Sequence, residues 1–409
     1  MRNILLLSLL LGLATAPPAA RAADTSFARI ERGRALTTAG DCVACHTTDE
    51  GKPFAGGRPI ETPFGIIYSP NLTPDRETGI GAWTDDQFYT AMHEGLGPSG
   101  RHLYPAFPYP YFTKVTRDDV MAIRAYLSTL PAVRNARRKS ELPWPLDQRF
   151  LLTGWNELFF EQGTYRPIAG KSAEWNRGAY LVEGLGHCGG CHTAKNFLGG
   201  DKTGSRLEGG SLQGWFAPNI TGEARTGLGS WSAEDIVDYL KNGRNAHSGA
   251  TGLMAEVVTD STSKLDPSDL HAIAVYLKDV PGHPLGVVPA KDGQVNTVGR
   301  AIYADSCSAC HQADGHGVPQ MFSPLAGSAL LQSADPTTLI RIVLEGARTA
   351  PTDRRPTTAA MPAYGWKLSD SQIAAVLTYV RNNWGNTASE VTDAQIRAVR
   401  ERLGRERDH

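Results

Sequence analysis

Apolar residues recur at the spacing of one helix face in three separate segments of the chain. In the first segment they fall at Val120, Ile123, Tyr126 and Leu127, and capping residues of the Asp/Ser type introduce each run. The pattern predicts three amphipathic helices, over residues 117–130, 267–280 and 369–384, whose apolar faces belong to a core. The equivalent apolar residues are Leu270, Ile273, Tyr276 and Leu277 in the second helix, and Ile373, Val376, Tyr379 and Val380 in the third.

Each of these helices closes a longer repeated pattern. A helical segment opened by a glycine comes first, and a capped middle helix lies between the two. The first two copies also share the strings Pro70-Asn71-Leu72-Thr73 and Pro218-Asn219-Ile220-Thr221. The opening glycines are Gly33, Gly178 and Gly299, and the middle helix is predicted to start at Thr84, Ser232 or Pro336 and to end near Gly95, Gly243 or Gly346.

All six cysteines belong to three copies of one pentapeptide, Cys-x-x-Cys-His. In c-type haem attachment two thiols add to the vinyl groups of the porphyrin and the adjacent histidine binds the iron. Disulfides would not explain a histidine after every cysteine pair, and zinc would need two such motifs to share one ion. We therefore predict three covalent haems, on Cys42 and Cys45, Cys188 and Cys191, and Cys307 and Cys310, with His46, His192 and His311 as axial ligands.

The repeat divides the chain into three haem domains. We predict a mainly α fold of three tandem class I cytochrome c domains joined by irregular linkers, because each unit is too small to build a core without its haem. Aromatic residues of the first linker are expected to pack between domains, with docking of a partner or a lipid as the alternative. These residues are Trp144, Phe150, Trp155, Phe159 and Phe160. The predicted boundaries are 24–130, 172–281 and 294–388 for the domains, 131–171 and 282–293 for the linkers, and 389–409 for a polar C-terminal tail.

The sixth ligand of each iron is sought among the methionines, because a His/Met domain carries its methionine after the middle helix. Met254 lies 62 residues after His192, and Met361 lies 50 after His311, so both are predicted ligands. The equivalent position in the first repeat is Phe107, which does not bind iron. Three options stay open there: a methionine recruited from elsewhere, a second histidine, or an open sixth position. The other residues considered are His93 and His102, which flank the site, Met92, a predicted buried helix residue, Met121, on the last helix, and Met321, a predicted wall of the third haem pocket.

Charge and the N-terminus set limits on partners and location. The 409 residues carry 41 Lys and Arg against 42 Asp and Glu, which lacks the basic excess of a nucleic-acid binder. Residues 1–22 have the form of a secretory signal peptide, with a basic start, an apolar run from Ile4 to Leu13 and an Ala-Arg-Ala cleavage site. That run falls short of the roughly 20 residues that span a bilayer. We therefore expect export to the periplasm.

A family resemblance rests on strings spread over nearly the whole mature chain. They lie at residues 102–106, 175–182, 191–193, 215–221, 255–258 and 384–386. Together with the haem motifs they make the chain resemble the three-haem cytochrome c subunits of periplasmic, membrane-associated dehydrogenases that oxidise alcohol, gluconate, fructose or sorbitol. The resemblance implies a subunit that takes electrons from a catalytic dehydrogenase subunit, alone or with a small third subunit, and delivers them to ubiquinone at the outer face of the cytoplasmic membrane.

Two features depart from that family. Alcohol dehydrogenase members carry methionine where this chain has Phe107, a variant associated with relatives that serve other dehydrogenases, including molybdenum hydroxylases. Many members also end in an amphipathic or apolar anchor, whereas residues 388–409 are polar and charged. This second departure weakens the inference of direct membrane anchoring, although peripheral association is still expected.

The chain offers no site for substrate oxidation. A Gly-x-Gly-x-x-Gly string between a strand and a helix is absent, and no domain is left for a flavin, quinone or molybdenum cofactor. We therefore assign no catalytic residue and predict an electron-transfer subunit of a dehydrogenase complex. The alternatives are an electron-acceptor subunit of a molybdenum hydroxylase or aldehyde dehydrogenase, and a peroxidase-like haem enzyme or small-ligand binder that uses an open site at the first haem.

Overall fold

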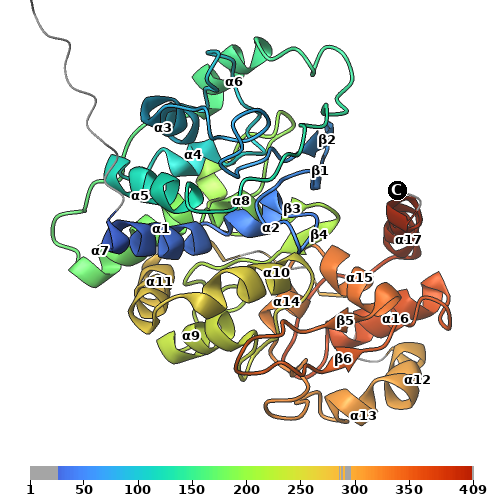
Figure 1. Ribbon diagram of the computed structural model, residues 1–409. Coiled ribbons are helices and arrows are strands. Elements are labelled where there is room, and N and C mark those ends of the chain that lie inside the picture. The colour runs from blue at the N-terminus through green and yellow to red at the C-terminus, as the bar shows by residue number, and fades with distance from the viewer. Residues whose placement is uncertain (1–25, 285, 287–288, 291–295, 408–409) are drawn as a thin grey trace, which may run out of the picture.

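The computed structural model describes residues 26–284, 286, 289–290 and 296–407, so the predicted signal peptide and part of the second linker lie outside the described residues. Helices dominate this part of the chain, and its strands form three small antiparallel sheets of two strands each. The predicted mainly α class is confirmed. Figure 1 shows three units in chain order: the first (blue to teal) lies against the second (green to yellow), and the third (orange to red) lies beside the second.

The middle helix of the first unit forms where the sequence places its caps. Thr84 Oγ1 accepts a hydrogen bond from Gln87 N at 3.1 Å, and Gln87 Oε1 accepts one from Thr84 N at 2.9 Å, which closes a capping box. Gly95 ends the helix in the left-handed conformation. The elements of this unit are α1 (Phe27–Ala39), α2 (Cys42–His46), β1 (Pro59–Thr62), β2 (Gly65–Tyr68), α3 (Asp85–Glu94), α4 (Tyr109–Phe112) and α5 (Arg117–Leu127).

The second unit repeats this plan. Ser232 and Asp235 form the capping box of its middle helix, and Gly243 ends that helix in the left-handed conformation. The elements are α7 (Ala173–Tyr180), which continues into the π-helical segment η1 (Leu181–Leu185), α8 (Gly189–His192), η2 (Thr203–Ser205), β3 (Gly210–Leu212), β4 (Trp215–Ala217), α9 (Ala233–Asn242), α10 (Leu253–Asp260), η3 (Thr262–Lys264) and α11 (Pro267–Asp279).

The third unit has the same helical frame. Its middle helix runs from Thr337 to Glu345 between Pro336 and Gly346, as the sequence predicts. The elements are α12 (Thr297–Ser306), α13 (Ser308–His311), α14 (Ala329–Gln332), α15 (Thr337–Glu345), β5 (Ala347–Arg348), β6 (Ala360–Met361), α16 (Asp370–Val380) and α17 (Asp393–Arg407). The three predicted closing helices are therefore α5, α11 and α16, each ending one to four residues earlier than expected.

The sequence pattern predicted that a glycine opens each first helix. In the structure this glycine instead lies inside the helix, at the point where the first helix crosses the closing helix. In α1 a Cβ on Gly33 would overlap the Ala122 carbonyl of α5 and lie 2.9 Å from the Tyr126 Cβ. Gly178 and Gly299 meet the equivalent tyrosines of α11 and α16 at 2.8 and 2.7 Å. Only a residue without a side chain allows the two backbones to approach so closely.

The first two units share one hydrophobic core, whereas the third has a core of its own. Residues of α7 and η1 pack against residues that end the first unit, such as Val115, which is fully buried. The boundary between the first and second units, called the seam below, also holds a buried polar contact. There Tyr180 OH donates to Asp119 Oδ2 at 2.6 Å and accepts from Thr116 N at 3.1 Å. The third unit is joined to the second by backbone contacts such as Ala350 N to Ala250 O at 3.0 Å.

The first linker is not irregular throughout, because it forms helix α6 (Leu151–Phe159). Its aromatic residues divide into two groups. Trp155, Phe159 and Phe160 are half-buried: Trp155 Nε1 donates to Leu198 O at 2.9 Å, and Phe160 packs edge-on against Tyr109. The other group, Trp144 and Phe150, is exposed to solvent. The expected packing role therefore holds for one half of the linker only.

The predicted polar tail is part of the third unit. Residues 393–407 form α17, and Ile396 and Leu403 on one of its faces are fully buried in the third core. On the polar side, Arg400 Nε donates to Asp370 Oδ1 of α16 at 3.0 Å. This segment was predicted to be a polar tail because charged residues outnumber its few apolar residues. Those apolar residues lie at helical spacing, and they form a core face only because α15 and α16 pack against them.

Candidate haem-attachment sites

Each Cys-x-x-Cys-His motif spans one short helix directly after the first helix of its unit. These helices are α2, α8 and α13, and each ends at its histidine. All six cysteines are free, so disulfides do not occupy them. One helical turn brings the two cysteines of a motif and the following histidine to the same face of the helix, which is the donor arrangement that a covalently attached haem requires.

The three motif histidines are oriented by backbone carbonyls. His46 Nδ1 lies 2.8 Å from Pro70 O, His192 Nδ1 lies 2.7 Å from Pro218 O, and His311 Nδ1 lies 3.0 Å from Ser323 O. Because a carbonyl only accepts, Nδ1 carries the proton in each ring and Nε2 keeps its lone pair for a metal. Burial lowers the pKa of all three imidazoles. The rings are thus neutral and ready to bind iron.

The sequence pattern did not identify the carbonyl groups that orient the three histidines. A repeated string, Pro-Asn-x-Thr, nevertheless marked two of them. Asn71 Oδ1 accepts from Thr73 N at 2.9 Å and from Thr73 Oγ1 at 2.7 Å. Asn219 makes the same two bonds with Thr221. The repeated Pro-Asn-x-Thr string therefore contains an Asx turn, which fixes the carbonyl of its proline as the acceptor for the histidine Nδ1. The third repeat uses Ser323 without this string, which explains why the string occurs only twice.

The first two attachment motifs lie next to each other. His187, which precedes Cys188, has its Nε2 3.3 Å from the carbonyl oxygen of Gly40, which lies two residues before Cys42. Burial raises the pKa of the Cys191 thiol to about 11, and the charge of Cys45 acts in the same direction, so these thiols of different domains are close enough to interact. The two attachment segments therefore lie side by side where the first unit meets the second.

Met254 and Met361, the predicted sixth ligands, both follow the middle helix of their unit but lie in regular elements. Met254 is the second residue of α10 rather than part of a loop, and it packs half-buried against the core of the first two units. Met361 lies in β6, paired with Ala347, and packs against the third core. Their role as iron ligands stays a prediction.

Phe107 occupies the equivalent place in the first unit and is packed among aromatic rings. Its ring centroid lies 5.4 Å from that of Phe112. Both ring nitrogens of His102 have partners in the linker, Thr153 Oγ1 at 3.1 Å and Asn156 Nδ2 at 3.2 Å. His93 is buried and stacks on Tyr89 with its Nδ1 3.4 Å from Thr113 Oγ1. These contacts engage both histidines in holding the unit together.

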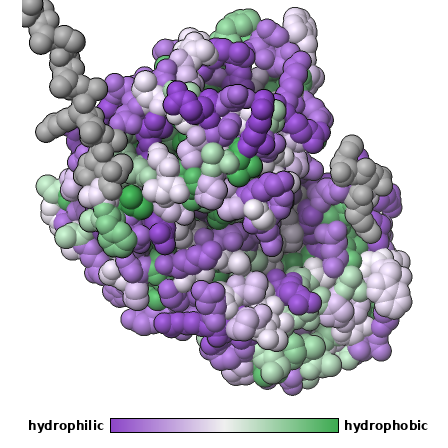
Figure 2. Space-filling view, viewed as in Figure 1, coloured by the Kyte–Doolittle hydropathy of each residue, from purple (hydrophilic) through white to green (hydrophobic). Residues whose placement is uncertain are grey.

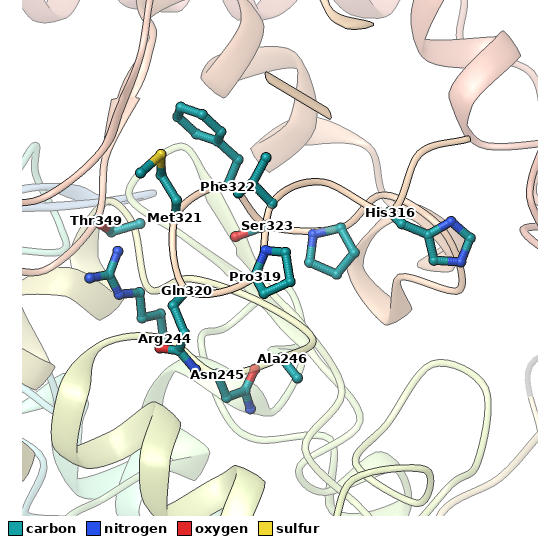
Figure 3. A pocket seen from close by; sticks show the side chains of 12 residues that line it. Arg244, Asn245, Ala246, His316, Pro319, Gln320, Met321, Phe322, Ser323 and Thr349 are labelled. Carbon is teal, nitrogen blue, oxygen red and sulfur yellow. The ribbon is translucent and has the colours of Figure 1, made fainter. Parts of the chain in front are cut away.

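The remaining methionines have positions of their own. Met92 is buried in the shared core, as predicted, and Met121 packs against that core from α5. Met321 is 55% exposed and lines a cavity of about 110 Å³ between the second and third units. Figure 3 shows the loop with Pro319 to Ser323 next to the loop with Arg244 to Ala246 across this cavity. Met321 therefore borders the unit junction, on the same loop as the Ser323 carbonyl that orients His311.

Comparison with known proteins identifies the same type of domain. Residues 30–131 and 297–384 match the cytochrome c family. The chain is 40% identical over 392 residues to the gluconate 2-dehydrogenase cytochrome c subunit of Pantoea cypripedii, covering 90% of this chain and 88% of that one. It is 39% identical over 400 residues to the cytochrome c subunit of the quinone alcohol dehydrogenase of Gluconobacter oxydans (strain 621H), covering 92% and 83%.

A third relative has a different architecture. It is a nicotinate dehydrogenase subunit of Pseudomonas putida, 41% identical over 392 residues, which cover 91% of this chain but 32% of that protein. This chain therefore corresponds to about a third of that relative. Within the residues that the structure describes, no helix has both the length and the apolar character needed to cross a bilayer.

Proposed function

Because this chain belongs to the family of cytochrome c subunits of dehydrogenases, we propose that it binds three covalent haem c groups and relays electrons from a separate catalytic dehydrogenase subunit to ubiquinone or another respiratory acceptor. The observation that carries the proposal is the threefold occurrence of one arrangement. In each copy two free cysteines precede a histidine whose Nδ1 is fixed by a carbonyl. Haem c held in this way supplies one-electron exchange with little change in geometry.

The residues of the chain have distinct tasks in this function. The six cysteines tether the three cofactors, and the histidines provide the proximal ligands in a fixed tautomer. Met254 and Met361 are the proposed sixth ligands of the second and third sites. The shared core of the first two units packs against their attachment segments through Cys42, Val43 and Cys188.

The adjacency of the first two sites supports a relay through the chain. His187 and Gly40 join the segments that precede Cys188 and Cys42, and this seam is built into one hydrophobic core. The third unit is fixed to the second through Phe216, whose backbone N and O are 2.9 Å and 2.9 Å from Thr338 Oγ1. Rigid contacts of this kind hold the sites at constant separations, as electron transfer between them requires.

The catalytic partner is proposed from the relatives. The cytochrome c subunits of gluconate and alcohol dehydrogenases favour a partner that oxidises an alcohol, sugar or sugar acid. Phe107 in place of methionine favours a molybdenum hydroxylase as the second candidate, and the relative named as a nicotinate dehydrogenase subunit adds nicotinate to the substrates considered. Export to the periplasm, on the evidence of the predicted signal peptide, places the complex at the outer face of the cytoplasmic membrane. Co-purification of the tagged chain with its catalytic subunit distinguishes the two candidates.

The test of the three-haem proposal is a haem count. The mature chain, washed with acid-acetone and assayed as the pyridine complex after dithionite reduction, should retain three haems per polypeptide. The masses of three haems should also remain on the denatured chain. A count below three, or a colourless washed protein, would overturn the proposal.

A further inference from the structure

Seven of the twelve large apolar residues that are exposed in the described chain lie on α6, just before it, or on the segment that Trp155 of α6 contacts. Trp144 and Phe150 are 81% and 70% exposed, and Leu158 is 70% exposed. Leu146, Leu151, Phe197 and Leu198 are also exposed, and Trp155 of α6 bonds the backbone of Leu198. We call these seven residues the linker surface: Trp144, Leu146, Phe150, Leu151, Leu158, Phe197 and Leu198. In Figure 2 most of the visible surface is hydrophilic, and a hydrophobic group protrudes at the top edge, above the position of α6 in Figure 1.

The linker surface is the outer face of a firmly held amphipathic helix. At 100° per residue, Phe150, Leu158 and Leu151 fall within about 100° of the helix circumference. The opposite face is anchored: Leu152 is buried, and Asn156 Oδ1 accepts from Tyr109 OH at 2.5 Å. The apolar face is therefore presented outward by the fold and has no partner among the described residues.

A cluster of three arginines borders this surface. Arg149 Nη1 donates to His102 O at 2.6 Å, and its guanidinium lies 4.3 Å from the Tyr104 ring centroid. The Tyr104 hydroxyl donates to Leu146 O at 3.1 Å, which ties the cluster to the linker surface. Partial burial and then the charges of neighbouring arginines lower the pKa of Arg137 and Arg149, so Arg101, Arg137 and Arg149 lie close together.

The cluster keeps an excess of positive charge. Among the described residues, none of these three arginines forms an ion pair with a carboxylate. Asp147, an acidic side chain of the linker, accepts a hydrogen bond from Gln148, and Glu157 lies exposed on α6. Three guanidinium groups without ion partners next to exposed tryptophan, phenylalanine and leucine side chains complement an anionic lipid surface, where apolar groups enter the acyl boundary and cations remain at the phosphates.

We propose that the linker surface docks the protein on anionic lipid headgroups, with Trp144, Phe150 and Leu158 inserted into the bilayer interface and the arginine cluster on the phosphates. This inference rests on the proposed function, since it names the membrane contact of the same electron-transfer subunit. Figure 1 shows α6 beside the first unit, at the end of the molecule away from the third unit. Docking at α6 thus brings the first unit nearest to the membrane and leaves the third unit free for a protein partner.

The experiment measures co-sedimentation of the mature, haem-loaded chain with vesicles of phosphatidylethanolamine and phosphatidylglycerol. We expect the chain to bind these vesicles and to bind pure phosphatidylcholine vesicles much less. Trp144→Glu combined with Phe150→Glu should weaken binding at least about tenfold, because two inserted aromatic rings are lost. Arg101→Gln or Arg137→Gln should weaken it about fivefold each, with less loss at high salt.

Matched variants separate docking from general hydrophobicity. Trp366, 83% exposed on the third unit, is the control for Trp144. Trp366→Glu should leave vesicle binding unchanged. Unchanged binding of the Trp144→Glu, Phe150→Glu variant would overturn the proposal, as would its loss of the catalytic subunit with no change in vesicle binding. The haem count and reduction by a soluble donor are measured in parallel, because their failure refutes the proposed function, whereas failure of the haem-loaded wild-type chain to bind anionic vesicles refutes only the docking.

Discussion

The first and second repeats build the same helical frame and then differ at the loop that follows the middle helix. In both, a glycine of the first helix lets the closing helix cross in backbone contact, and a capping box starts the middle helix. After the left-handed glycine, the first repeat runs through the aromatic loop around Phe107, whereas the second enters α10 with Met254. Close backbone contact between the first and closing helices fixes the helical frame. The loop after the middle helix is not held in this way, so its residues can differ between repeats and change what surrounds the proposed haem site.

An equivalent ion pair shows how the seam alters one copy. Arg32 pairs with Asp119 in the first repeat, as Arg177 pairs with Asp269 in the second. The Asp269 side chain keeps 21% of its surface exposed, but that of Asp119 keeps only 3%, since Tyr180 of the second repeat covers it. The same Arg–Asp pair thus has a buried aspartate in the first repeat and a partly exposed one in the second, because only the first is covered by the neighbouring unit.

The largest effect is expected where the two repeats are most alike. Gly33→Ala and Gly178→Ala each force a methyl group into a facing carbonyl, so each should destabilise its unit by about 3 kcal/mol. Thermal denaturation of the haem-loaded protein measures this. Gly154→Ala, in α6 with no atom within 4 Å of the added methyl, is the control and should be neutral or slightly stabilising. Unequal losses at Gly33 and Gly178 would show that the two crossings differ.

The loop difference predicts different redox behaviour. Met254→Leu and Met361→Leu should each lower one midpoint potential on the order of 100 mV, which is about 2.3 kcal/mol for one electron, because an axial methionine raises the potential. A redox titration resolves the three midpoints. Three unchanged midpoints in either variant would refute that methionine as a ligand.

Phe107→Met is the converse change in the first repeat. If the first iron has an open sixth position, dithionite-reduced wild-type protein should bind carbon monoxide at one site, and Phe107→Met should abolish this by supplying a ligand. Carbon monoxide difference spectra check both statements. A wild-type protein without a spectral change would rule out the open site and, with it, the haem-enzyme and ligand-binding alternatives.

The seam predicts a smaller effect on stability. Tyr180→Phe removes the hydroxyl that covers buried Asp119, so the variant should lose about 1–3 kcal/mol of unfolding free energy. Chemical denaturation measures the loss. The control is Tyr303→Phe, since Tyr303 is also buried and its hydroxyl donates to Gln312 O within the third unit, away from the seam. An equal loss of unfolding free energy in both variants would mean that the Tyr180–Asp119 hydrogen bond stabilises the protein no more than a tyrosine hydrogen bond away from the seam.

The smallest effect concerns a surface pair between the two repeats. Arg58 Nη2 lies 2.7 Å from Glu256 Oε2 of α10, and both side chains are partly exposed. Arg58→Gln or Glu256→Gln should cost less than about 1 kcal/mol, because exposed pairs are screened by solvent. A double-mutant cycle gives the coupling energy. A coupling well above that value would show that this pair, rather than the shared core, positions α10 against the first repeat.

Features that depend only on residues close together in the chain could be predicted from the sequence. The six cysteines with their histidines, the capping residues of the middle helices and the apolar faces of the closing helices needed no long-range information, because each acts over one or two helical turns. The repeated glycines were visible too, but their role was misread, since a helix start and a helix crossing leave the same residue in the sequence.

The primary sequence determined the three attachment motifs, the helical frame and the candidate methionines, as these follow from spacing within short segments. Tertiary structure alone decided which carbonyl orients each histidine, that α17 completes the third core, that the first two motifs lie side by side, and which aromatic residues of the linker stay exposed. Those features join groups tens to hundreds of residues apart, and such contacts are selected by the burial and packing of the whole chain rather than by any local pattern.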